Sequence, residues 1–142
     1  MMKVTFWGVR GSIPACGVEY TQFGGHTSCV QVQADGLNII FDMGTGAPDL
    51  GRQVLNQTPE TEPLPLHILL SHYHLDHLSG LPFFGPLYQA RSQISFYGMG
   101  PVEQRLNGFM GPPYFPVKIQ YTLSTKSFHK ITPKEPLWLT PK

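Results

Sequence analysis

The chain has 142 residues, of which 41% are hydrophobic and 13% are charged, and its formal net charge is +1. A chain of this length can bury about two thirds of the surface that it exposes when unfolded, which favours a single domain. Lysine and arginine number four against seven acidic residues in positions 1–100 and six against two in 101–142, an excess too weak to indicate a nucleic-acid-binding face.

The first third of the chain predicts three strands. Residues 3–7 form a candidate strand, and residues 8–17 form a glycine-containing loop. Residues 29–34 and 37–41 flank Asp35-Gly36, a dipeptide that is a strong hairpin signal, and Val30, Val32 and Ala34 alternate on one face of the first segment. We therefore expect these two segments to pair as an antiparallel hairpin.

A helix and a buried strand follow. Residues 48–56 place Leu50 and Val54 on one stripe and Pro48 in the first helical turn, where proline is favoured. Residues 66–70 are almost continuously apolar, which is typical of a strand that is buried on both faces of a sheet.

Three histidines and one aspartate occur within six residues just after this strand. In extended backbone, side chains two residues apart share a face, so His72 and His74 can reach one ion together. Asp76 and His77 come where the chain must turn, and they can face a second position beside the first. A lone histidine in a loop commonly packs on a neighbour, but a cluster this dense predicts a metal site.

Imidazole nitrogen and carboxylate oxygen are ligands that zinc favours, and manganese or iron accepts the same set with more oxygen. We expect one or two Zn²⁺ ions, with Mn²⁺ and Fe²⁺ as alternatives. A bound ion lowers the pKa of its water towards neutrality and so provides a hydroxide nucleophile. The expected activity is metal-dependent hydrolysis, with Asp76 as the candidate catalytic side chain that orients the nucleophile.

Beyond the motif, the chain predicts more strands and one helix. Residues 94–97 form a candidate strand, and 101–110 a candidate helix with an apolar stripe. Residues 119–123 and 128–131 are expected to pair as a closing hairpin.

The sequence gives no sign of export. Its apolar runs are too short to cross a bilayer, and the amino terminus lacks the pattern of a signal peptide. Cys16 and Cys29 have neither zinc-ribbon nor redox spacing, and Cys29 is expected to be a small core residue. We expect a cytoplasmic protein with no membrane partner.

The pattern His-x-His-x-Asp-His after a buried strand resembles the signature of the metallo-β-lactamase fold. Further segments are similar to the phosphodiesterase-like branch of that family, which includes relatives of tRNA 3′-end processing nucleases and cyclic-nucleotide phosphodiesterases. These segments are 6–14 (FWGVRGSIP), 24–29 (GGHTSC) and 40–46 (IFDMGTG). The resemblance extends from Lys3 to about Leu139.

The resemblance implies a role for each residue of the motif. His72 and His74 correspond to ligands of a first metal ion, and Asp76 and His77 to ligands of a second. Asp42 corresponds to a carboxylate that lies behind the ligands and orients a histidine. The alternative is that Asp42 caps the helix that begins near residue 48.

The resemblance also implies three ligands that this sequence does not supply: a histidine, an aspartate that bridges the metals, and a final histidine. No aspartate follows Asp76, and His129, the only histidine after Gly80, corresponds to a strand residue. His26 stands where the family usually has asparagine, and we expect it to stabilise a turn.

The implied fold is an α+β, four-layered αββα sandwich, present here mainly as its amino-terminal half. We therefore expect one domain, residues 1–142, truncated at its carboxyl end, with a mixed sheet and helices on one face. The other face of the sheet would need a cover, either a second copy in a homodimer or the missing carboxyl-terminal half.

Two classes of function remain open. The first is a phosphodiesterase acting on a small phosphodiester or nucleotide, with nucleic acid only weakly supported. The second is a catalytically silent module that binds metal or a partner. Hydrolysis of thioesters or other esters uses the same motif, but the FWGVRGS opening favours phosphodiesters. The sequence identifies no substrate-binding residue.

Overall fold

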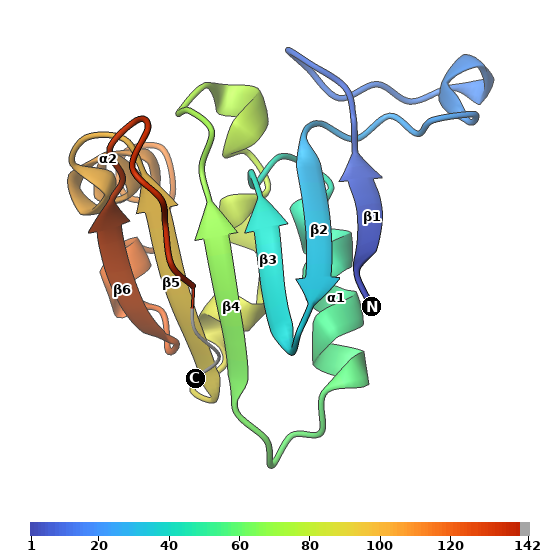
Figure 1. Cartoon of the computed structure of the whole chain (residues 1–142). Helices are drawn as coiled ribbons and strands as arrows, with labels where there is room; N and C mark the ends of the chain where they lie inside the picture. Colours follow the sequence, from blue (N-terminus) through green and yellow to red (C-terminus); the bar gives the residue numbers. More distant parts are fainter. Residues whose placement is uncertain (140–142) are drawn as a thin grey trace.

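The computed structural model describes residues 1–139, which form a six-stranded mixed sheet (Figure 1). The strands lie in chain order: β1 (Lys3–Gly8), β2 (Cys29–Ala34), β3 (Leu37–Phe41), β4 (Leu64–Leu69), β5 (Ser92–Gly98) and β6 (Thr125–Lys130). The pairs β1–β2 and β2–β3 are antiparallel, and the pairs β3–β4, β4–β5 and β5–β6 are parallel. The helices are α1 (Ala47–Gln57) and α2 (Val102–Phe109).

The predicted hairpin between β2 and β3 is confirmed. Asp35 and Gly36 both adopt positive φ angles, 49° and 78°, as a tight two-residue turn requires. Glycine and aspartate are among the residues that tolerate this left-handed conformation, so this dipeptide fixes where the chain reverses.

The core lies on one face of the sheet. Ile40, Ile68, Phe96 and Phe128 are partners across β3 to β6, and the rings of Phe96 and Phe128 stack with centroids 5.5 Å apart. Both helices contribute buried side chains to this cluster: Leu50 and Val54 from α1, and Val102 and Leu106 from α2. The prediction of a mixed sheet with helices on one face is confirmed.

The opposite face carries a different row of partners across the strands. It runs Phe6, Val30, Phe41, Leu69, Tyr97 and His129. Phe6 is 68% exposed and Phe41 41% exposed, so the part of this face near β1 and β3 is open to solvent. This is the face expected to need a cover, and the identity of that cover stays a prediction.

The predicted closing hairpin is wrong. Residues Ile119–Tyr121 form a 3₁₀ turn, and β6 pairs in parallel with β5. The connection from β5 to β6 contains α2. It brings the chain back across the core face to the end of the sheet at which β5 begins. Alternating polarity identifies a strand but does not identify its partner or its direction.

No helix within residues 1–139 is long and apolar enough to cross a membrane. The two helices named above have 11 and 8 residues.

The two cysteines should differ sharply in reactivity. Cys29 is fully buried, and burial, together with the nearby charge of Asp42, raises the pKa of its thiol to about 12, whereas Cys16 is exposed. Because the thiolate is the nucleophile, iodoacetamide should alkylate Cys16 in the native protein and reach Cys29 only after denaturation. Peptide mass mapping with and without urea measures this, and equal native rates would contradict the buried position of Cys29.

Candidate metal centre

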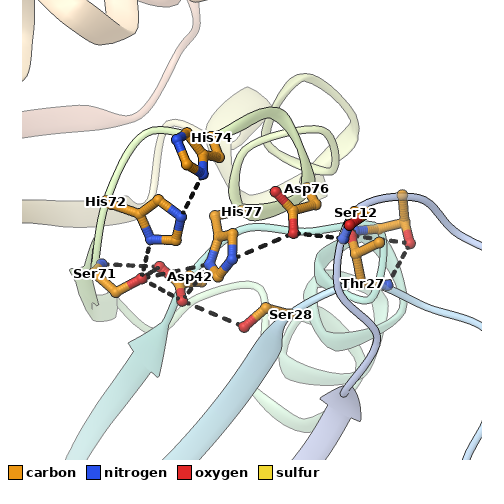
Figure 2. Close-up of polar contacts among 10 residues, drawn as sticks. Ser12, Thr27, Ser28, Asp42, Ser71, His72, His74, Asp76 and His77 are labelled. Atoms are coloured by element: carbon orange, nitrogen blue, oxygen red, sulfur yellow. Dashed lines mark hydrogen bonds and ion pairs between the residues drawn. The ribbon is translucent and has the colours of Figure 1, made fainter.

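The site forms where two parallel strands end side by side. Asp42 follows β3, and Ser71 and His72 follow β4, while the N–H of Asp42 donates to the carbonyl of Leu69 at 3.0 Å. Parallel neighbours bring their carboxyl ends to one edge of the sheet, so residues about 30 positions apart in sequence meet there. Figure 2 shows the polar side chains gathered at this edge.

Asp42 is the buried base of the cluster, with its side chain 7% exposed. Its carboxylate accepts hydrogen bonds from Ser71 N and Ser71 Oγ, each at 2.9 Å, and from Ser28 Oγ at 3.3 Å. His77 Nδ1 lies 2.8 Å from Asp42 Oδ2. This contact fixes the imidazole so that Nε2 faces the opposite side, the arrangement expected of a carboxylate that orients a ligating histidine.

The alternative role for Asp42 as a helix cap is wrong. The N-cap residue of α1 is Gly46, and within residues 1–139 no side-chain capping hydrogen bond is made at that end of the helix. Asp42 instead directly follows β3, with a positive φ of 60° that directs the chain into the site.

The four candidate ligands form two pairs of facing donor atoms. His72 Nε2 lies 3.0 Å from His74 Nδ1, and His77 Nε2 lies 3.4 Å from Asp76 Oδ2. Two nitrogen or oxygen ligands on a tetrahedral zinc ion, each about 2.0–2.2 Å from it, are roughly 3.3 Å apart. The rings of His72 and His77 have centroids 4.0 Å apart, so the two pairs are adjacent. The donor types are those that zinc favours, and both donor separations lie near this tetrahedral spacing.

Each pair supplies two donors. Within residues 1–139, no three or more His, Cys, Asp or Glu side chains are grouped in a way that could hold a single ion. Catalytic zinc sites commonly have three protein ligands and a water.

Asp76 is held from the other side by the loop that follows β1. The N–H of Ser12 donates to Asp76 Oδ2 at 2.8 Å. This hydrogen bond is the main cause that holds the pKa of Asp76 below its usual range, and the nearby His77 and His72 act in the same direction. Asp76 is therefore in the ionised form that a metal ligand requires.

Two backbone hydrogen bonds hold the motif against the segment that follows β3. Met43 N–H donates to His77 O at 2.8 Å, and Gly80 N–H donates to Met43 O at 2.9 Å. A Cβ on Gly44 would lie 2.4 Å from Asp76 O, and one on Gly80 would lie 2.0 Å from Gly44 O. Only glycine permits this approach.

The other two histidines considered from the sequence have different partners. His26 is exposed, and its Nδ1 lies 3.2 Å from Thr45 Oγ1 while its Nε2 lies 3.6 Å from Asp49 Oδ2. These contacts link the loop before β2 to the start of α1, in keeping with a turn-stabilising role. His129 stacks on Tyr97 at 4.7 Å, on the face opposite the core.

Sequence reasoning missed the three serines that complete the cluster. Ser71 directly precedes the motif, and this position was the available signal. Ser28 and Ser12 reach Asp42 and Asp76 from residues 14 and 64 positions away, and no local pattern marks them.

Comparisons with known proteins identify the family of this chain. The profile of the metallo-beta-lactamase superfamily matches residues 23–94, half of the chain. The chain is 28% identical over 138 residues to a ribonuclease Z of Methanococcus maripaludis, covering 92% of this chain and 41% of the relative.

Two solved structures share the fold. The metallo-beta-lactamase fold protein YhfI from Bacillus subtilis gives a TM-score of 0.61 at 20% identity, over 99% of this chain and 49% of that one. The short form of human tRNase Z gives a TM-score of 0.58 at 22% identity, over 92% of this chain and 45% of that one. This chain thus spans less than half the length of each of these relatives, and by the match over residues 23–94 it belongs to the metallo-beta-lactamase superfamily.

Proposed function

We propose that this chain carries the metal-binding half-site of a metal-dependent phosphodiesterase. The observation that carries the proposal is the pairing of donors, His72 with His74 and Asp76 with His77, at separations of 3.0 and 3.4 Å that suit two adjacent ions. Zinc is the ion that this donor set favours, and manganese or iron is the alternative.

The chain's own residues have distinct tasks in this proposal. His72 and His74 would hold one ion, and Asp76 and His77 the other. Asp42 keeps the His77 ring in place, and Ser12 keeps the Asp76 carboxylate ionised and aimed. When bound, the ions supply a hydroxide nucleophile at neutral pH and offset the negative charge of a phosphodiester.

The class of substrate is supported by likeness. Ribonuclease Z, by its name, acts on RNA, which is a phosphodiester, and the segments 6–14, 24–29 and 40–46 resemble the same branch. We propose a phosphodiester substrate, either a small cyclic or linear nucleotide or the end of a nucleic acid.

A second function is favoured by one specific observation. Each metal position has two protein donors within residues 1–139. A chain with such positions can bind metal without turnover, as a catalytically silent metal-binding module.

Metal analysis combined with turnover of bis-p-nitrophenyl phosphate tests the proposal. We expect the purified chain to bind zinc and to release p-nitrophenol, and we expect His74→Ala to abolish that release. The substitution should weaken zinc binding by more than about 100-fold, since loss of groups behind the ligands alone costs 10–100-fold.

His129→Ala is the matched control, because His129 is also an exposed histidine and lies outside the two pairs. It should leave both readings unchanged. Metal binding without turnover would select the silent module, and failure of the chain to bind metal above background would contradict both functions.

A further inference from the structure

Tyr73 lies between the two histidines of the first pair but is anchored elsewhere. In extended backbone, neighbouring side chains point to opposite sides, so Tyr73 points away from the contact between His72 and His74. Its hydroxyl donates to the carbonyl of Met99 at 3.0 Å, in the segment that connects β5 to α2. The tyrosine therefore ties the motif to a different part of the fold.

Arg105 of α2 contacts both the Tyr73 ring and the Met99 carbonyl. Its guanidinium carbon lies 4.5 Å from the centre of the Tyr73 ring, a cation–π geometry, and its Nη1 donates to the same Met99 carbonyl at 2.9 Å. Gly100, with a φ of 75°, lets the arginine pass: a Cβ there would lie 2.9 Å from Arg105 Nη2.

Gly98, the last residue of β5, has no side chain and so leaves room for the tyrosine hydroxyl. A Cβ on Gly98 would lie 2.5 Å from Tyr73 Oη and 3.3 Å from its Cζ. The close approach of Tyr73, and not a left-handed backbone, is what favours glycine here.

The segment of residues 72–74 makes few backbone hydrogen bonds. Within the described residues, the N–H groups of residues 72–74 donate no backbone hydrogen bond, and His74 receives one through its carbonyl, from His77 N at 3.0 Å. The side chain of Tyr73 thus links this part of the motif to the segment between β5 and α2, in addition to the hydrogen bond between Ser71 Oγ and His72 Nδ1 at 3.0 Å and the contact of the His72 and His77 rings.

We propose that Tyr73, held by Arg105 and the Met99 carbonyl above Gly98, is a positioning residue that sets the spacing of the His72 and His74 donor atoms. Its role in metal binding rests on the proposed function, whereas its role in holding the segment does not. The Tyr73 side chain contacts Met99, Arg105 and Gly98, so it would act through the neighbouring histidines.

Hydrogen exchange tests the anchor without any metal. In Tyr73→Ala, the hydrogen-bonded amides of residues 77–79, whose acceptors are the carbonyls of His74 and Leu75, should exchange about tenfold faster, while the central strands keep their protection. Tyr73→Phe keeps the ring beneath Arg105 and should change exchange by about threefold or less. Tyr121→Ala, at an exposed tyrosine outside the site, is the matched control. Unchanged exchange at residues 77–79 in Tyr73→Ala would overturn the proposal.

Cobalt titration tests the consequence for the ligands. Tyr73→Ala should weaken Co²⁺ affinity by about tenfold and alter the d–d absorption band, as expected when a supporting group behind ligands is lost. If the wild-type chain binds no Co²⁺, the proposed function fails and hydrogen exchange still decides the anchor. If the wild type and Tyr73→Ala bind Co²⁺ with equal affinity and identical spectra, positioning of the ligands is overturned.

A double-variant cycle separates this specific contact from a general loss of stability. Gly98→Ala alone should displace the tyrosine and reproduce the faster exchange, because its new methyl group occupies the position of the hydroxyl. In the Tyr73→Ala background the same methyl group meets only Val102 Cγ2, at an ordinary contact distance of 3.5 Å, so Gly98→Ala should add nothing further. Additive effects of the two substitutions would contradict the proposed contact, and Tyr73→Phe serves as the milder variant if either alanine variant fails to fold.

Discussion

Asp42→Asn is expected to lower the free energy of unfolding by about 2–4 kcal/mol and to weaken metal binding by about 10–100-fold. The buried carboxylate accepts hydrogen bonds from Ser28, Ser71 and His77. An amide of the same shape replaces one accepting oxygen by a donor, so at least one of these groups faces another donor and the His77 ring loses its restraint.

The design of this substitution isolates the carboxylate from the backbone. Asparagine tolerates a positive φ as well as aspartate does, so the φ of 60° at position 42 adds no new strain. Asp35→Asn is the control, because Asp35 also has a positive φ, 49°, but lies in an exposed turn. Urea unfolding and zinc competition measure the two effects, and equal results for the two variants would refute the role given to Asp42.

Gly80→Ala should cost about 3 kcal/mol of stability and disturb the metal site at the same time. The added Cβ would lie 2.0 Å from the carbonyl oxygen of Gly44 and 3.0 Å from Pro48 Cδ. The first of these is a backbone atom, so the segment after His77 must move away from the segment after Asp42. Because Met43 bonds to both His77 and Gly80, this movement pulls on the ligand itself.

Gly108→Ala is the matched control for that variant. Gly108 is exposed on α2, and a Cβ there meets nothing within 4 Å. Since alanine is the better helix former, this change should raise stability by about 0.5–1 kcal/mol. Thermal and urea unfolding compare the two variants, and a Gly80→Ala protein as stable as wild type would show that the close packing of the two segments is unimportant.

The sequence predicted those parts of the fold that depend on local pattern. The hairpin at Asp35-Gly36 follows from two residues suited to left-handed backbone, and α1 follows from Pro48 and a regular apolar stripe. The strand β5 was predicted as four residues, 94–97, but has seven, because it begins at Ser92, which is buried although it is polar, and ends at Gly98.

The direction of β6 could not be read from its residues. A strand's alternation shows which side chains share a face, but the choice between a hairpin and a parallel crossover is made by packing between distant segments. The helix α2 buries Val102 and Leu106 on the same face as Phe96 and Phe128, and that packing places β6 beside β5 in parallel.

The candidate site shows the same division. Its four candidate ligands lie within six positions, so spacing alone identified them as candidates. The supports of those donors were less evident: Asp42 and Ser12 reach the motif across 35 and 64 positions, and Tyr73 was hidden by lying between two histidines. Such contacts exist only after the sheet has brought β1, β3, β4 and β5 together.

The most direct test of the account is zinc X-ray absorption of the metal-loaded chain together with its metal content. We predict retained zinc with nitrogen and oxygen ligands at about 2.0–2.2 Å, imidazole scattering, and no sulfur shell near 2.3 Å. We further predict loss of the imidazole signal in the double variant His72→Ala with His74→Ala. Retained zinc bound through cysteine sulfur, or a chain that retains no zinc, would contradict the assignment of the metal centre to His72, His74, Asp76 and His77.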